Sequence, residues 1–128
     1  TQLGDTSPEE TLKQKLLFSS NQEAVANVLS PFDFVELHKG WIPEVFEQAA
    51  ELASRRFALV HIDVDLYAPI LASLRFFGPR MSEGGVIVVD DYASSNFPGA
   101  TTAVDEFIAE YPPKLALAGQ TGGMLLLY

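Results

Sequence analysis

Cysteine is absent from this 128-residue chain, which excludes both a disulfide framework and a thiolate metal site. Long apolar runs are missing too, since no stretch approaches the ~20 residues that span a bilayer. The opening "TQLGDTSPEE" contains neither a basic cluster nor an apolar stretch, so it predicts no signal peptide. From these absences we expect a soluble cytoplasmic protein without a membrane partner.

Basic residues are scarce. The chain has 8 Lys and Arg against 17 Asp and Glu, which gives a formal net charge of −9. An acidic surface repels phosphate backbones, so we expect no nucleic-acid partner. Clustered carboxylates do attract hard cations such as Mg²⁺ or Ca²⁺. Many soluble proteins are acidic for solubility alone, so the charge leaves a cation site open without establishing one.

The hydrophobic pattern predicts one α/β domain over residues 1–128, in which residues 1–32 form a helical lead-in. Apolar residues make up 48% of the chain, enough for a core. The alternation of strands and helices favours a mainly parallel sheet with an antiparallel end. Helices are predicted up to Leu17, over 22–29 and 43–53, on the stripe Ile70, Leu71, Leu74 and Phe77, and around Val104, Phe107, Ile108 and Tyr111; strands are predicted over 34–38, 58–62 and 86–89, with a hairpin over 114–128.

Two apolar runs end in pairs of carboxylates. In "FALVHIDVDLY" the run is closed by Asp63 and Asp65, and in "GGVIVVDDY" by Asp90 and Asp91. Ligands of open α/β sheets bind beyond the carboxyl ends of the strands, and consecutive units often lie side by side. We therefore expect the two pairs to converge. Crowded carboxylates raise each other's pKa, and a bound Mg²⁺ or Ca²⁺ would remove that cost.

The spacing also suggests different roles within one pair. If strand geometry persists, Asp63 and Asp65 project to the same side and Val64 to the opposite one. One carboxylate would then hold a metal while the other serves as general base for a substrate hydroxyl. Capping of the following helix explains any single aspartate equally well. Two paired strand ends in one chain favour a site.

Three further residues have open interpretations. His38 ends a predicted strand and fits a structural or surface role better than a ligand role. His61 lies within the apolar run Ala58–Ile62, which is apolar on both faces as in a strand buried between helix layers, so we expect a core or helix-facing residue. Trp41 follows Lys39-Gly40 and suits either the wall of an aromatic or adenine pocket or a core anchor.

These residues carry a family resemblance. The segment "ALVHIDVDLYAPILASLRFFGPRMSEGGVIVVDDY" followed by "FPGATTAVDEF" resembles the macrocin O-methyltransferase family. Its members are S-adenosylmethionine-dependent enzymes that methylate sugar hydroxyls of macrolide and aminocoumarin antibiotics. "HKGWIPEVF" is similar to a Lys-Gly-Trp segment of the family, and "GQTGGMLLLY" to its closing hairpin. The resemblance implies a partial Rossmann-like methyltransferase sheet and a small-molecule hydroxyl acceptor.

The resemblance also implies roles for the acidic residues. Asp63, Asp90 and Asp91 match the family positions that bind a divalent cation, usually Mg²⁺. Asp65 matches the general base that takes the proton from the acceptor hydroxyl. The cation would orient vicinal oxygens and lower the pKa of that hydroxyl.

Cofactor contacts are implied for Gly40, Trp41 and Asp63. Family members have two more strands and a glycine-rich loop before the region matched here, so we expect a C-terminal part of the fold with most of the cofactor site missing. An isolated part would have weak or no activity, and its exposed sheet edge would invite a homodimer or pairing with a missing half. The alternatives are a non-catalytic binding or assembly module and, less favoured, a Mg²⁺-dependent phosphoryl-transfer protein.

Overall fold

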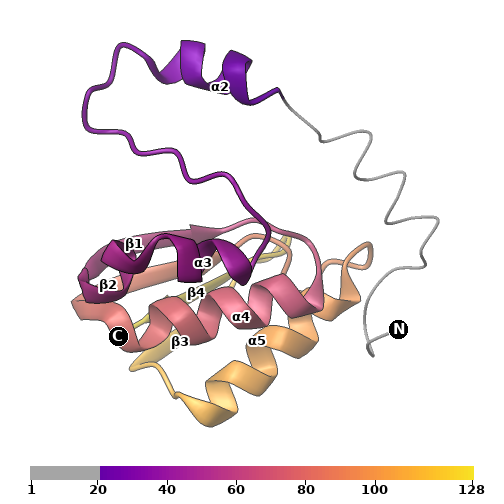
Figure 1. Ribbon diagram of the computed structural model, residues 1–128. Coiled ribbons are helices and arrows are strands. Elements are labelled where there is room, and N and C mark those ends of the chain that lie inside the picture. Colours follow the sequence, from indigo (N-terminus) through magenta and orange to yellow (C-terminus); the bar gives the residue numbers. More distant parts are fainter. Residues whose placement is uncertain (1–20) are drawn as a thin grey trace.

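The computed structural model describes residues 21–128, so the helix predicted up to Leu17 lies outside the described range. Helices and strands alternate along the chain, and Figure 1 shows the sheet beside a helical layer. The elements are α2 (Gln22–Leu29), α3 (Glu44–Gln48), η1 (Ala50–Ser54), β1 (Phe57–Ile62), α4 (Tyr67–Phe77), η2 (Gly78–Arg80), β2 (Met81–Val89), α5 (Pro98–Glu110), β3 (Leu115–Ala118) and β4 (Met124–Leu127). The predicted α/β class is confirmed.

One sheet with the strand order β1-β2-β4-β3 organises the chain. β1 and β2 are parallel neighbours, and the crossover helix α4 connects them. β4 is antiparallel to both β2 and β3. The predicted terminal hairpin is therefore confirmed. Its connection uses Gly122 and Gly123 at φ +113° and +86°, a conformation that side chains disfavour.

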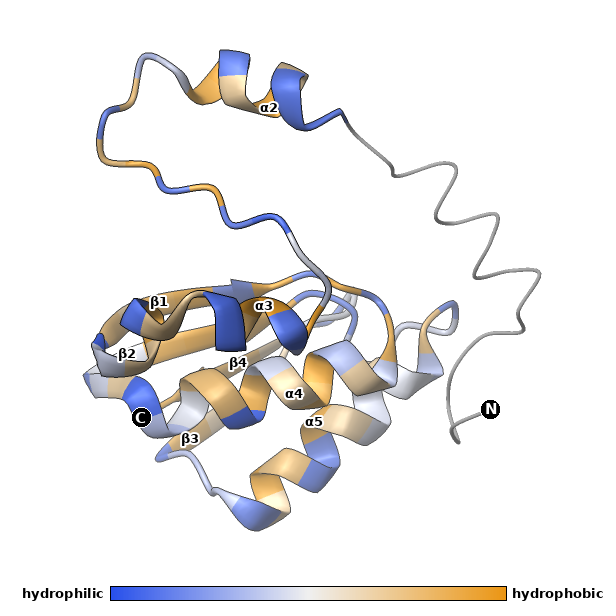
Figure 2. Cartoon of the chain, viewed as in Figure 1, coloured by the Kyte–Doolittle hydropathy of each residue, from blue (hydrophilic) through white to orange (hydrophobic). Residues whose placement is uncertain are grey.

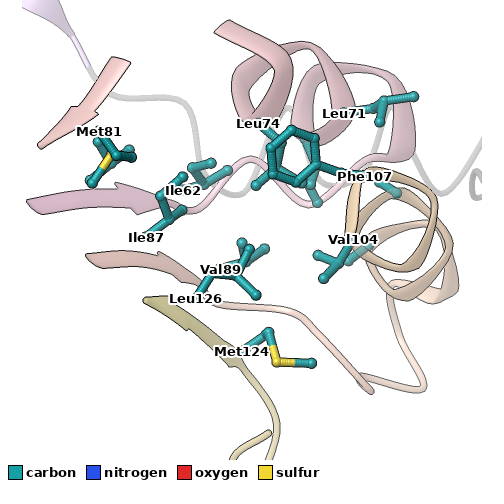
Figure 3. Packing of buried hydrophobic residues seen from close by; sticks show 14 residues of the cluster. Ile62, Leu71, Leu74, Met81, Ile87, Val89, Val104, Phe107, Met124 and Leu126 are labelled. Carbon is teal, nitrogen blue, oxygen red and sulfur yellow. The ribbon is translucent and has the colours of Figure 1, made fainter. Parts of the chain in front are cut away.

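Helices α4 and α5 pack on each other and cover one face of the sheet, where the core lies (Figure 3). Ile87, Val89 and Leu126 of the central strands are fully buried under Leu74 and Phe107 of the two helices. In Figure 2, apolar colour follows the strands and the inner sides of these helices. This packing confirms the stripes predicted for both helices, except that Tyr111 is exposed and its ring stacks on Tyr128, with the centroids 5.5 Å apart.

The opposite face of the sheet is apolar and uncovered in the described part of the chain. Strand register places Leu59, Val86, Leu127 and Leu115 in one row across it. Leu59 is 68% exposed, and the side chain of His61, two residues further along, is also largely exposed. The prediction that β1 is buried on both faces is therefore wrong, because helices α4 and α5 cover only the other side.

The strand predicted over residues 34–38 is also wrong. These residues belong to an irregular segment that leads from α2 to α3 away from the sheet (Figure 1), and Phe34 is 80% exposed. A strand needs a neighbour for its N–H and C=O groups. β1 is an edge strand of the described sheet, and nothing in residues 21–128 pairs with its outer edge.

A local signal accounts for the start of α2. Asn21 caps α2 by accepting a hydrogen bond on its side-chain oxygen from the Glu23 N–H at 2.9 Å. The single helix predicted over 43–53 is instead α3 followed by the 3₁₀ turn η1. The helices of residues 21–128 are all too short or too polar to cross a bilayer.

Candidate active and metal site

Two connections meet at the carboxyl ends of β1 and β2. The first turn covers residues 63–66 after β1, and the second covers residues 90–93 after β2. They are brought together by a hydrogen bond in which the Asp90 N–H donates to the Ile62 carbonyl at 3.0 Å. Each turn contains a non-glycine residue with positive φ, Asp65 at +60° and Ala93 at +63°. Such backbone conformations are uncommon outside glycine and gather at functional sites.

Three carboxylates converge at this point. Asp63, Asp65 and Asp91 each offer an oxygen, and these oxygens all lie within 4.8 Å of one another. Asp63 is exposed, while Asp65 and Asp91 are half-buried and share a side-chain hydrogen bond. The geometry thus brings together three of the four aspartates for which convergence was predicted. Oxygen-only donors of this kind suit a hard divalent cation.

Asp90 stands apart from this cluster. Its Oδ1 lies 3.9 Å from Nε2 of His61, and both side chains are more than half exposed. The structure therefore groups Asp65, rather than Asp90, with Asp63 and Asp91. The expectation that His61 faces the core or a helix is wrong, because its strand position points to the uncovered face.

The crowding shifts the protonation of the cluster. Burial raises the pKa of Asp91 to about 6, followed in effect by the negative charge of Asp65 and by the hydrogen bond that the protonated Asp91 carboxyl donates to it. The pKa of Asp65 is raised as well, mainly by burial and then by the charges of Asp63 and Asp90, although its hydrogen bond to Asp91 opposes the shift. In the absence of a cation, Asp65 and Asp91 therefore retain a shared proton at pH values above those at which a carboxyl group usually ionises.

A pH dependence of stability follows from this shift. The folded-state pKa of Asp91 lies above that of the unfolded chain, so its contribution is favourable at low pH and is lost as pH rises through about 6. Because Asp91 is only half-buried and partly screened by solvent, we expect a loss of only ~1 kcal/mol between pH 4.5 and 7. Urea unfolding in Mg²⁺-free buffer checks this, and Asp91→Asn should abolish that part of the slope. An unchanged slope in the variant would contradict the assignment.

A cavity of about 330 Å³ adjoins the cluster. Asp63 and Val64 line it from the β1 side, and Ile42 and Val45 line it from the segment before and within α3. Of the residues for which the resemblance implies cofactor contacts, Asp63 is part of this lining. Gly40 and Trp41 do not line the cavity.

The Gly40–Trp41 segment is held next to α3 instead. A Cβ added to Gly40 would lie 2.9 Å from that of Val45, so this glycine permits a close approach. The Trp41 carbonyl accepts a 2.7 Å hydrogen bond from the Val45 N–H, and its side chain is 72% exposed. The cofactor contact of these two residues remains a prediction.

A second group with metal-ligand chemistry is an exposed ion-pair network. The two ring nitrogens of His38 face separate carboxylates, Glu36 at 3.5 Å and Glu51 at 4.0 Å. Arg55 pairs with Glu36 at 3.0 Å, and its hydrogen bond and charge lower the pKa of that carboxyl. His38 therefore has the surface role that its sequence context suggested.

Sequence reasoning missed the residues that hold the second turn. The Thr101 Oγ1 accepts a 2.9 Å hydrogen bond from the Ala93 N–H, and the Tyr92 hydroxyl donates to Asp105 at 3.0 Å. The Tyr92 carbonyl accepts from the Gly123 N–H at 2.8 Å. In the sequence, "ATTAVDEF" reads only as an amphipathic helix, so no signal marked these partners.

Solved methyltransferases share this fold. The O-methyltransferase NovP matches with a TM-score of 0.70 and 20% identity, over 98% of this chain and 53% of NovP. CalS11, a TDP-rhamnose 3'-O-methyltransferase of calicheamicin biosynthesis, matches with a TM-score of 0.55 and 21% identity, over 83% of this chain and 49% of its own. An O-methyltransferase from Bacillus cereus in complex with SAH gives a TM-score of 0.57 and 16% identity, over 98% and 84% of the two chains. The fold is thus that of a Rossmann-like methyltransferase.

Sequence comparison identifies the family. Residues 5–112 match the macrocin O-methyltransferase family, TylF, and the chain belongs to that family. A relative from Streptomyces olivaceus, 8-demethyl-8-(2,3-dimethoxy-alpha-L-rhamnosyl)-tetracenomycin-C 4'-O-methyltransferase, is 34% identical over 61 residues. That match covers 48% of this chain and 22% of the relative. The chain therefore spans only part of the relatives that it matches, and the resemblance read from the motifs is confirmed.

Proposed function

We propose that this chain forms the metal- and acceptor-binding part of an S-adenosylmethionine-dependent O-methyltransferase that uses Mg²⁺ to methylate a sugar hydroxyl. One observation carries the proposal: Asp63, Asp65 and Asp91 converge within 4.8 Å at the carboxyl ends of β1 and β2 in a member of this family. The strand ends are where open α/β sheets bind ligands.

The residues fit a magnesium ion. Mg²⁺–oxygen distances of about 2.1 Å place two ligand oxygens roughly 3 to 4 Å apart, close to the spacing available here. A dication would also relieve the repulsion that raises the pKa values of Asp65 and Asp91. Geometry and resemblance both support Asp63 and Asp91 as ligands, whereas the proposal for Asp90 rests on the resemblance alone. The bound ion would supply Lewis-acid chemistry that lowers the pKa of the acceptor hydroxyl.

Asp65 is proposed as the general base. Its half-buried carboxylate lies beside the proposed ligands, so it would accept the proton of a hydroxyl placed at the cluster. S-adenosylmethionine, for which Gly40, Trp41 and Asp63 would supply this chain's contacts, would provide the methyl group that the acceptor oxygen receives. The product is SAH, the compound bound by the Bacillus cereus structure.

The cavity beside Asp63 and the Gly40–Trp41 segment are proposed as this chain's share of the cofactor site. The chain spans 53% of NovP, so the proposal for the whole reaction includes residues beyond this chain. The names of CalS11 and of the Streptomyces olivaceus relative both include rhamnose or a rhamnosyl group. We therefore propose a deoxysugar hydroxyl as the acceptor class.

Calorimetric titration of the chain with Mg²⁺ tests the metal proposal. We expect binding by the wild type and loss of binding in Asp91→Asn, because the variant removes a charged ligand from the cluster. Asp33→Asn is the matched control, since it removes the same charge from the exposed segment before α3. If the wild-type chain binds no Mg²⁺ at millimolar concentration, the proposal is contradicted.

Titration with S-adenosylmethionine, with and without Mg²⁺, completes the experiment, together with transfer of labelled methyl groups to rhamnosyl acceptors. We expect weak cofactor binding because the chain spans about half of NovP. The outer edge of β1, with which no strand of residues 21–128 pairs, supports one alternative, a non-catalytic assembly role with pairing to a second copy. A chain that binds neither ligand but sediments as a dimer would favour that alternative.

A further inference from the structure

We infer that Thr101 and Tyr92 are positioning residues that hold the turn after β2 so that the carboxylate of Asp91 stays within the cation-binding cluster. The inference rests on the proposed function, since it concerns the same cluster. It gives a positioning role to two residues that lie within the segments resembling the family but to which the resemblance assigned no role.

The first anchor is the hydrogen bond between Ala93 and α5. Ala93 has φ +63°, a conformation that costs an alanine free energy and persists only where surrounding contacts enforce it. Its N–H donates to Thr101 Oγ1 at 2.9 Å. Thr101 is the fourth residue of α5 (Pro98–Glu110). Without this acceptor the strained turn loses a contact that fixes its direction.

The second anchor is Tyr92, which is held at both ends. Its carbonyl accepts the Gly123 N–H at 2.8 Å, and its hydroxyl donates to Asp105 Oδ1 at 3.0 Å. Hydrogen bonds to the hairpin connection and to α5 therefore fix the residue that follows Asp91. Together with the bond from the Asp90 N–H to the Ile62 carbonyl, three separate elements fix a turn of four residues.

Fixation matters here because the cluster is electrostatically unfavourable without a cation. The charge of Asp65 faces Asp91, and those of Asp63 and Asp90 act on it as well. Mutual repulsion would drive a freely moving turn away from β1. Hydrogen bonds from outside the cluster oppose that movement and pre-organise the ligands, as outer-shell partners do in metal sites.

Thr101→Val provides the test, because it keeps the shape and the charge but removes the hydroxyl. We expect the Mg²⁺ affinity of the 128-residue chain, measured by calorimetry, to fall by on the order of 10-fold. Thr101→Ser restores the oxygen and should restore the affinity. Thr102→Val is the matched control: Thr102 is exposed, and its hydroxyl donates only to the Pro98 carbonyl within the helix at 3.4 Å.

Amide hydrogen exchange in metal-free buffer gives a second readout. In Thr101→Val the Ala93 amide should exchange faster than in the wild type, while the amides of β2 keep their protection, and Tyr92→Phe should lower Mg²⁺ affinity in the same direction. Unchanged Ala93 exchange, or unchanged Mg²⁺ affinity in a chain that binds Mg²⁺, would overturn the inference. A wild type that binds no Mg²⁺ contradicts the proposed function instead, and the exchange result still decides whether Thr101 holds the turn.

Discussion

Asp65→Asn is expected to slow methyl transfer by roughly 100- to 10,000-fold, the contribution usual for a general base. An amide cannot accept the proton of the acceptor hydroxyl at neutral pH, yet it keeps an oxygen at the same position. The effect should therefore fall on kcat, with a smaller change in Mg²⁺ affinity. Labelled methyl transfer to a rhamnosyl acceptor at saturating Mg²⁺ and cofactor measures it, in whatever assembly carries the activity.

The same variant should fold at least as well as the wild type. Burial and the charges of Asp63 and Asp90 raise the pKa of Asp65, which means that its ionised form is unfavourable in the folded chain. Asp33→Asn, the charge-matched control, should leave both kcat and stability unchanged. If Asp65→Asn retained activity within a few-fold of the wild type, the base would have to be another group.

Phe107→Ala should destabilise the fold by about 3–5 kcal/mol, as expected for truncation of a fully buried phenylalanine. The ring of Phe107 packs under Leu74 and against the bare backbone of Gly78, where an added Cβ would lie 2.4 Å from the ring. A domain of this size has about 5–15 kcal/mol of stability in total, so the loss approaches unfolding. Urea denaturation followed by circular dichroism measures the change.

Phe34→Ala deletes the same ring at a position that is 80% exposed. We expect a change within about 0.5 kcal/mol for this control. Equal effects of the two variants would mean that the core is not centred on the contact between α4 and α5. A Phe107→Ala chain too unstable to purify can be replaced by Phe107→Leu, for which a smaller loss in the same direction is expected.

The parts of the fold that sequence could predict are those fixed by neighbours close in the chain or by an apolar stripe. The stripe Ile70, Leu71, Leu74 and Phe77 predicted α4, and the glycines around 119–123 predicted the hairpin, because both signals are local. The segment 34–38 has an equally good strand pattern and is not a strand. Its outcome depends on a neighbouring strand, which no local pattern reveals.

The candidate site also has a part that the sequence predicts and a part that depends on contacts between distant residues. The rule that ligands bind at strand ends predicts all four aspartates at one edge of the sheet from the sequence alone. It did not distinguish Asp65 from Asp90 as the third member of the cluster, because that choice depends on the positive φ of Asp65 and on the exposed pairing of Asp90 with His61. Thr101 lies on a helix of ordinary composition, and only its distance to Ala93 reveals its role.

One face of β2 is uncovered in residues 21–128, so the tolerance of its positions to substitution depends on what lies over that face. Ile87 and Val89 are closed in by the helices, so they should resist polar replacement under all conditions. Val86 and Val88 point to the other side, where tolerance depends on whether another protein surface lies over them. A deep substitution scan along this strand in living cells would therefore read out, residue by residue with a period of two, whether that face is in contact with water or with a partner.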